Sequence, residues 1–236
     1  MLALNTLMSW SGGKDSALAL YHARRDPRRR VTQLLTNVNV HYERVSMHGV
    51  RVALLEAQAQ RLGLPLRQLR LPEQPTMPEY EQALLEVLGS AQAQGVKEVT
   101  YGDIFLEDLR VYREQQLARV GLRGYFPLWQ RPGTSLLREF WELGFRAVVV
   151  CVNERWLDAS FCGRLLDADF VRDLPPGVDP CGENGEYHSF VFDGPDFSSP
   201  IPVVPGERVR RTYAAPSSDD ATEINFWFCD LQMAGA

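Results

Sequence analysis

The stretch LNTLMSWSGGKDS, residues 4–16, places a pair of glycines where an apolar segment gives way to an amphipathic one. Residues 4–10 have the composition of a buried strand, and residues 16–25 have the pattern of a helix. Two glycines allow several consecutive N–H groups to turn toward one point, and the N-terminus of the helix adds positive potential. A glycine pair can also serve packing alone, but the flanking serines and Lys14 favour a site for phosphate.

Apolar runs alternate with amphipathic stretches on the C-terminal side of this turn through the first half of the chain. That alternation is typical of a parallel sheet with helical crossovers, so the sequence predicts an α/β fold with a Rossmann-like parallel sheet. Further strands are expected at residues 31–40, 66–71 and 98–101 and near Tyr125, and helices at 50–62, 80–94 and 109–120. Prolines at 72, 75 and 78 are expected to form the loop before the third helix.

The second half of the chain changes character after residues 127–129. Eight of the fifteen prolines lie from Pro175 onward, and that region has no convincing helical pattern. A helix is expected at residues 135–143, and strands at 147–152, 187–192, 208–214 and 224–229. We therefore predict a first domain at residues 1–128, which contains the glycine turn, and a smaller α+β domain at residues 129–236 that closes over it.

Composition narrows the function classes. The chain has 236 residues and a formal charge of −5, which argues against a nucleic-acid partner, because cationic surface drives binding to phosphate backbones. The four cysteines form no CxxC pair, and we expect them to be reduced thiols. The N-terminus has no basic signal-like segment, and no apolar run approaches the roughly 20 residues of a membrane span. A cytoplasmic location without a membrane contact is expected.

The glycine turn differs from the Walker A motif, because position 8, where that motif needs a glycine, is Met. It resembles instead the PP-loop, SGGxDS, of the ATP pyrophosphatase superfamily. The resemblance implies that the turn holds the pyrophosphate end of ATP and leaves the α-phosphorus open to attack, so that an adenylate forms. The predicted phosphate-binding residues are Ser11, Gly12, Gly13, Lys14, Asp15 and Ser16.

Mg²⁺ is expected with ATP, because the charge on a departing pyrophosphate must be neutralised. The ion bridges phosphate oxygens with one or two carboxylates. Asp15 and Asp103 are the candidate metal ligands.

Further blocks of sequence extend the resemblance beyond the superfamily. Together with SGGKDS, the segments YERVSMHGVR (42–51), GDI (102–104), PLW (127–129), GENGEYHSF (182–190) and DGP (193–195) resemble the diphthine-ammonia ligase family. These blocks span residues 9 to about 197. The resemblance implies that a carboxylate is adenylated, that pyrophosphate leaves and that ammonia displaces AMP. The acceptor carboxylate would lie on a protein similar to elongation factor 2 or on a small molecule. Whether the chain forms a homo-oligomer is left open.

The GENGEYH block places Glu183, Glu186 and His188 within six residues. Ammonium must lose a proton before it attacks, and a carboxylate or imidazole in a dry site can accept that proton. These three residues, with Lys14 and Asp103, are the candidate catalytic residues. On a strand, Glu186 and His188 would share one face and Tyr187 the other, and only one face is expected to line the cleft.

The ends of the predicted strands supply further candidates, because ligands of open α/β sheets bind beyond the carboxyl ends of strands. Asn37 and Val38 are expected to meet adenine through backbone groups, and Gly102 is expected to lie at the nucleotide. The loop after the second strand offers three candidates for substrate contact: His41, Arg44 and His48.

Two other functions are weighed against amide synthesis. A tRNA-modifying PP-loop enzyme also uses adenylation, but the acidic charge and the lack of a cysteine pair count against it. An ATP-binding sensor protein would bind the nucleotide without releasing pyrophosphate.

Overall fold

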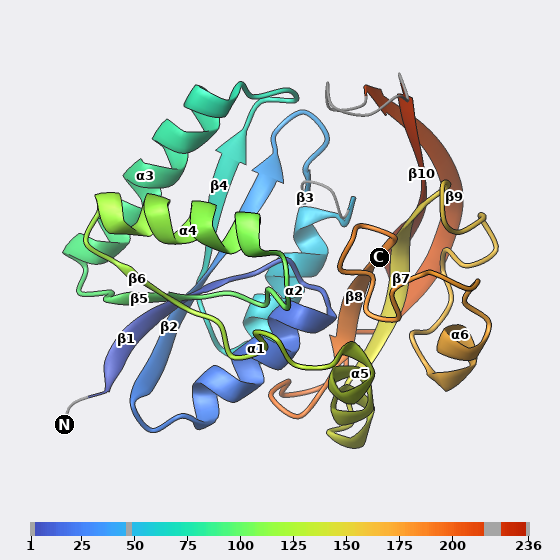
Figure 1. Cartoon of the computed structure of the whole chain (residues 1–236), viewed down its shortest axis with the longest axis horizontal. Coiled ribbons are helices and arrows are strands. Elements are labelled where there is room, and N and C mark those ends of the chain that lie inside the picture. Colours follow the sequence, from blue (N-terminus) through green and yellow to red (C-terminus); the bar gives the residue numbers. More distant parts are fainter. Residues whose placement is uncertain (1–2, 46–48, 215–222, 235–236) are drawn as a thin grey trace.

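The computed structural model of the chain describes residues 3–45, 49–214 and 223–234. Figure 1 shows two β-sheets with helices between and around them. Sheet A contains β1 (Leu4–Ser9), β2 (Arg29–Asn39), β3 (Arg44–Val45), β4 (Leu66–Leu71), β5 (Glu98–Thr100) and β6 (Arg123–Tyr125). Sheet B contains β7 (Arg146–Asn153), β8 (Tyr187–Asp193), β9 (Val203–Ala214) and β10 (Glu223–Met233). The helices are α1 (Lys14–Arg25), α2 (Val52–Leu62), α3 (Met77–Ala93), α4 (Glu107–Arg119), α5 (Gly133–Glu142) and α6 (Ala168–Arg172).

Sheet A is parallel except for β3. β1 pairs with β2 and β5, β4 pairs with β2, and β6 pairs with β5, all in parallel register. The chain therefore builds outward from β1 in one direction and then in the other, which leaves a switch point between the carboxyl ends of β1 and β5. This topology confirms the predicted α/β class with a Rossmann-like sheet.

Two apolar layers flank sheet A. The smaller cluster packs β1, β2, β4 and β5 against α3 and α4. The larger one joins α1 and α2 to sheet B and α5, so that α1 and α2 lie between the two sheets (Figure 1). A central helical layer that packs on both sheets explains why these two helices carry so many fully buried residues, such as Ala19, Leu20 and Leu55.

Sheet B is antiparallel, with the order β8-β7-β10-β9. β7 is buried along almost its whole length, as expected for the central strand of the second half. β8 lies at the edge toward α1, and its first residues reach the carboxyl end of sheet A. That edge position brings the GENGEYH block to the glycine turn.

The helix predicted from residue 80 begins earlier. α3 begins at Met77, with Thr76 as its N-cap in a capping box with Glu79. Pro78 therefore lies in the first turn and not in the preceding loop. A proline is tolerated there because the first N–H groups of a helix have no intrahelical partner.

Other differences concern short or irregular elements. β3 and α6 were not expected. β3 has two residues and α6 has five, and elements this short leave no periodic pattern in the sequence. β9 begins at Val203, five residues before its predicted start, although it includes Pro205. It is an edge strand with an irregular register opposite Cys229–Leu231, where a proline is tolerated.

None of the helices in the described part of the chain is both long enough and apolar enough to cross a membrane.

Candidate functional site

The glycine turn connects the buried end of β1 to the start of α1. Gly12 has a φ of +80°, which favours glycine. The turn is closed by hydrogen bonds among its own serines: the Ser16 hydroxyl donates to the Gly13 carbonyl at 2.9 Å, and the Gly13 N–H donates to Ser11 Oγ at 3.3 Å. The result is a compact loop at the N-terminus of a 12-residue helix, as an anion site requires.

Lys14 is buried at the first position of α1, with only 5% of its surface exposed. Its Nζ lies 2.7 Å from both carboxylate oxygens of Asp15 and 5.7 Å from the centre of the Tyr187 ring. Lys14 is not a surface lysine, because Tyr187 and Ser189 of β8 lie against it. Burial alone would lower the pKa of Lys14, but the neighbouring groups, with Asp15 first among them, together outweigh burial and hold this pKa above its ordinary value.

β8 binds the glycine turn directly. The N–H of Val191 donates to the carbonyl of Gly12 at 2.9 Å, and the N–H of Lys14 donates to the hydroxyl of Ser189 at 3.1 Å. The buried amide of Gln58 donates to the same Gly12 carbonyl at 2.9 Å. Three hydrogen bonds from two further elements, β8 and α2, thus hold the turn.

Glu183 faces the turn from the loop before β8. Its Oε1 accepts a hydrogen bond of 2.8 Å from the N–H of Ile104, next to Asp103. Burial, with the nearby charge of Asp15, raises the pKa of Glu183 to about 7. A carboxyl group with that pKa exchanges a proton at neutral pH, which suits a general base or acid.

Glu186 and His188 have different surroundings. The Glu186 carboxylate is buried and accepts hydrogen bonds from the N–H groups of Asp179 and Asn184 and from the Asn184 side chain, at 2.9–3.1 Å. His188 borders the pocket, and burial beside Lys14 lowers the pKa of His188 to about 4. The imidazole is therefore neutral at pH 7.

Gly102 and Asp103 follow β5 at the switch point. A side-chain carbon on Gly102 would lie 2.8 Å from the backbone carbonyl carbon of Asp15, so only glycine allows this approach to α1. Asp103 is 8% exposed and forms an ion pair with Arg113 of α4, with 2.7 Å between Arg113 Nε and Asp103 Oδ2. The Arg113 guanidinium also lies 4.3 Å from the centre of the Tyr101 ring.

These groups surround one cavity of about 240 Å³. It is lined by the glycine turn, the residues after β5, α4, the loop before β8 and the start of β8. The lining includes Ser11, Gly13, Lys14, Asp15, Ser16, Gly102, Asp103, Arg113, Gly182, Glu183, Gly185, Tyr187, His188 and Ser189. Tyr187 and His188 both line it. The expectation that only one face of the strand meets the cleft is wrong, because β8 approaches the cavity with its end and not with one face.

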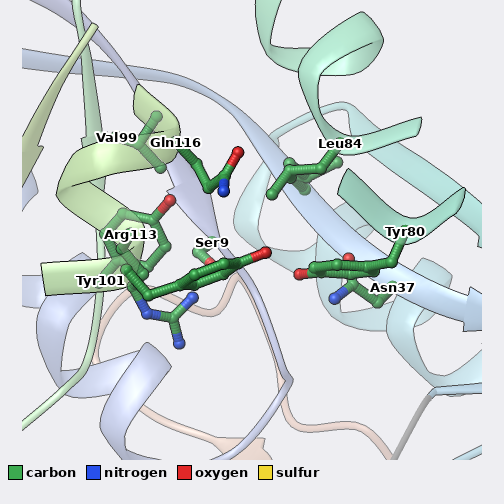
Figure 2. A pocket seen from close by; sticks show the side chains of 10 residues that line it. Ser9, Asn37, Tyr80, Leu84, Val99, Tyr101, Arg113 and Gln116 are labelled. Atoms are coloured by element: carbon green, nitrogen blue, oxygen red, sulfur yellow. The ribbon is translucent and has the colours of Figure 1, made fainter. Parts of the chain in front are cut away.

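A second cavity of about 30 Å³ adjoins the first and shares Ser9, Tyr101 and Arg113 with it. Asn37 lies on its wall, at the end of β2. Figure 2 shows the hydroxyls of Tyr80 and Tyr101 pointing toward one another across this space. Burial raises the pKa of Tyr101 to about 12, so its hydroxyl keeps its proton at neutral pH.

Three further predicted residues that the structure describes, Val38, His41 and Arg44, do not line the main cavity. Val38 is buried in β2, between β3 and β4. His41 is exposed, with its ring edge-on to Tyr42. Arg44 binds Asp230 of β10 at 2.7 Å, which ties β3 to sheet B. His48 lies outside the described residues.

Asp15 and Asp103 both line the cavity, and each is paired with a cation of the chain. Across residues 3–45, 49–214 and 223–234, no group of three or more His, Cys, Asp or Glu side chains is arranged to hold a metal ion. Two carboxylates and no third protein ligand fit an ion that arrives with phosphates, as Mg²⁺ does.

Three residues at the site were not singled out from the sequence: Gln58, Arg113 and Tyr101. Gln58 carries the clearest signal, because it is a polar residue at helical spacing from Leu54, Leu55 and Leu62 on the apolar face of α2. Arg113 is one of many arginines, and its sequence context does not distinguish it.

Comparison with known proteins matches both halves of the chain to one group of proteins. The sequence profile of the diphthamide synthase N-terminal domain matches residues 4–124, and that of the diphthamide synthase C-terminal domain matches residues 133–215. The diphthine–ammonia ligase of Bos taurus is 30% identical over 184 residues, which cover 72% of this chain and 68% of the relative. The enzyme of Homo sapiens is 30% identical over 71% of this chain and 67% of its own length, and that of Mus musculus 29% over 86% and 84%.

Proposed function

The chain belongs to the diphthamide synthase family, and its relatives are named diphthine–ammonia ligases. From that premise we propose that it is an ATP-dependent ligase that joins ammonia to a carboxylate. One observation carries the proposal. The glycine turn and the Glu183 carboxyl face the same cavity, so a nucleotide and a proton acceptor can meet there.

ATP would lie with its phosphates at the turn. The N–H groups at the start of α1, the hydroxyls of Ser11 and Ser16 and the Lys14 ammonium are the donors for the β- and γ-phosphates. Gly102 allows the nucleotide to pass close to the backbone. The adenosine end would extend over the end of β2, toward Asn37 and the small cavity beside Tyr101. Val38, in the same strand, is the second residue proposed to meet adenine through its backbone groups.

The proposed reaction has two steps. An acceptor carboxylate oxygen attacks the α-phosphorus, and pyrophosphate leaves to give an acyl adenylate. Ammonia then attacks the acyl carbon, an amide forms, and AMP leaves with the oxygen of the original carboxylate. Donors that bind the departing pyrophosphate lower the barrier of the first step, because they stabilise charge that develops in its transition state.

Mg²⁺ would be held between the phosphates and the carboxylates of Asp15 and Asp103. When bound, the ion neutralises charge on the departing pyrophosphate. Lys14 and Arg113 already balance these carboxylates in the structure, so the cavity remains electrically close to neutral before the nucleotide enters.

Glu183 is the proposed proton acceptor for ammonium. Its carboxyl lines the cavity and has a pKa near neutral pH. His188 is a weak base with a pKa of about 4, so we assign it a binding role. Glu186 holds the loop of residues 179–184 through three hydrogen bonds and is assigned to positioning Glu183.

The proposal also covers the acceptor and the boundary between the two domains. The proposed acceptor is a carboxylate on a protein similar to elongation factor 2 or on a small molecule, and His41, Arg44 and His48 stay predicted contacts of that acceptor. The boundary between the ATP-binding domain and the closing domain is placed near residue 128, between sheets A and B. A cytoplasmic location and the oligomeric state stay predictions.

The test is to identify the products of ATP turnover with ammonia and a candidate acceptor by chromatography. AMP and pyrophosphate are expected, in amounts equal to the amide formed. ADP and phosphate would contradict the proposal, and binding of ATP without release of pyrophosphate would indicate a sensor instead of a ligase.

A further inference from the structure

Gln58 is a fully buried amide on an otherwise apolar helix face. It lies in α2 among Leu54, Leu55 and Leu62, and none of its surface is exposed. Burial of an amide is unfavourable unless its polar atoms find partners. An apolar side chain would fill the same space at lower cost, so the partners of Gln58 indicate why an amide stands there.

Its polar atoms contact three segments of the site. Trp10 Nε1, at the end of β1, donates to Gln58 Oε1 at 2.9 Å. Gln58 Nε2 donates to the carbonyl of Gly12 in the glycine turn at 2.9 Å and to the carbonyl of Val191 in β8 at 2.6 Å. One side chain thus connects the end of sheet A, the turn and the edge of sheet B.

The contact fixes a peptide group of the turn. The Gly12 carbonyl accepts from both Gln58 and the N–H of Val191, at 2.9 Å each. In a trans peptide the following N–H points the opposite way, so the Gly13 N–H is directed toward Ser11 Oγ and the interior of the turn. A side-chain carbon on Gly12 would lie only 2.7 Å from Gln58 Oε1, which shows how closely the amide packs on the turn.

We propose that Gln58 is a positioning residue for ATP: it holds the glycine turn in its phosphate-binding form and joins that turn to β8. The inference rests on the proposed function. It predicts that loss of the amide weakens ATP binding even where the fold is kept, because the turn then has to be ordered by the nucleotide itself.

The test compares Gln58→Met with a control on the same helix. Methionine keeps the length of the side chain and loses all three hydrogen bonds. Leu62→Ala removes buried apolar contacts near the end of α2, away from the turn, and controls for loss of stability. Calorimetry measures the ATP dissociation constant of each, thermal unfolding measures the melting temperature, and pyrophosphate release measures kcat and KM.

For Gln58→Met we expect a dissociation constant raised by about tenfold or more, which equals about 1.4 kcal/mol, and a matching rise in KM for ATP. Leu62→Ala should lower the melting temperature and leave the ATP affinity unchanged. If Gln58→Met does not fold, Trp10→Phe removes the bond to Oε1 together with part of the buried ring, keeps both bonds of Gln58 Nε2, and should raise the ATP dissociation constant by about threefold.

Two results would overturn the inference, and they are distinguishable. A wild-type chain that binds no ATP would reject the proposed function and this inference together. A wild-type chain that binds ATP, with a folded Gln58→Met or Trp10→Phe variant of equal affinity, would reject the inference alone and leave Gln58 a packing residue.

Discussion

The hydroxyl oxygen of Ser189 accepts a hydrogen bond of 3.1 Å from the backbone N–H of Lys14, a residue 175 positions earlier in the chain. The bond joins the first residue of α1 to β8, the edge strand of sheet B. A residue of the second half of the chain therefore contacts the glycine turn that we propose to bind phosphate.

Substitution of Ser189 tests that coupling. In Ser189→Ala the N–H of Lys14 loses its acceptor, so the ATP dissociation constant should rise by about two- to tenfold, the value of one neutral hydrogen bond. Calorimetry with ATP and Mg²⁺ measures the change. Ser199→Ala, at an exposed serine beyond β8, is the control and should match the wild type. Equal affinity in both variants would contradict the coupling.

Lys14 and Asp15 are expected to be essential for binding ATP. Lys14→Met removes a buried charge that would contact phosphate, and Asp15→Asn removes its partner, so each should raise the ATP dissociation constant by at least about tenfold. Because Lys14 is buried, its variant should also unfold at a lower temperature than the wild type. Lys97→Met changes the only other lysine, which is exposed, and serves as the control. Unchanged affinity in Lys14→Met would argue that the turn binds no phosphate.

The elements that could be predicted from the sequence are those with a long local pattern. β1, β4 and α1 begin and end within two residues of their expected limits, because apolar runs and helical periodicity are local properties. The glycine turn was predicted for the same reason, since its residues are contiguous. Its placement beside Glu183 follows from a family resemblance and not from any local rule.

Contacts between distant segments could not be predicted. The sequence around Arg113 does not indicate that this residue pairs with Asp103. The sequence around Gln58 likewise does not indicate that its amide contacts Gly12 and Val191. The burial of Lys14 has the same origin, because β8 covers it and α1 alone would leave it exposed. The pKa of Glu183 likewise depends on burial that only the fold creates.

The pair of Arg113 and Asp103 should contribute to stability. Arg113→Met leaves the Asp103 carboxylate buried without its cation, and loss of one partner of a buried pair costs about 3–5 kcal/mol, with the lower end expected for a guanidinium that is one-quarter exposed. Denaturant unfolding measures the loss. Arg172→Met breaks an ion pair that is exposed on both sides and should change the free energy of unfolding by less than about 1 kcal/mol. Similar small effects from both variants would show that the buried pair adds little.

Glu183 should make the protein less stable as the pH rises. Its pKa is about 7 in the folded chain against an ordinary value of 4.5, so between these pH values the folded state holds a proton that the unfolded state has released. The free energy of unfolding therefore falls as the pH rises through this window, by at most about 3 kcal/mol from this group. Glu183→Gln keeps an oxygen for the Ile104 N–H and carries no such charge, so its stability relative to the wild type should increase from pH 4.5 to pH 7. Denaturant unfolding at several pH values would detect the change, and a constant difference would contradict it.

Glu183 should also give amide synthesis its dependence on pH. A proton acceptor works in its ionised form, so kcat/KM for ammonia should rise with pH and show an inflection near pH 7, where the Glu183 carboxyl ionises. Glu183→Gln should lower the rate at saturating ammonia by at least about 10²-fold, abolish that inflection and keep ATP affinity within a few-fold. Ionisation of ammonium itself adds a slope at higher pH that both proteins share.

Glu186→Gln is the matched control, because the Glu186 carboxylate binds the loop and does not line the cavity. This variant should be less stable than the wild type, and its inflection near pH 7 should stay. A Glu183→Gln variant that kept the full rate or the same inflection would exclude Glu183 as the acceptor and direct attention to His188, which also lines the cavity.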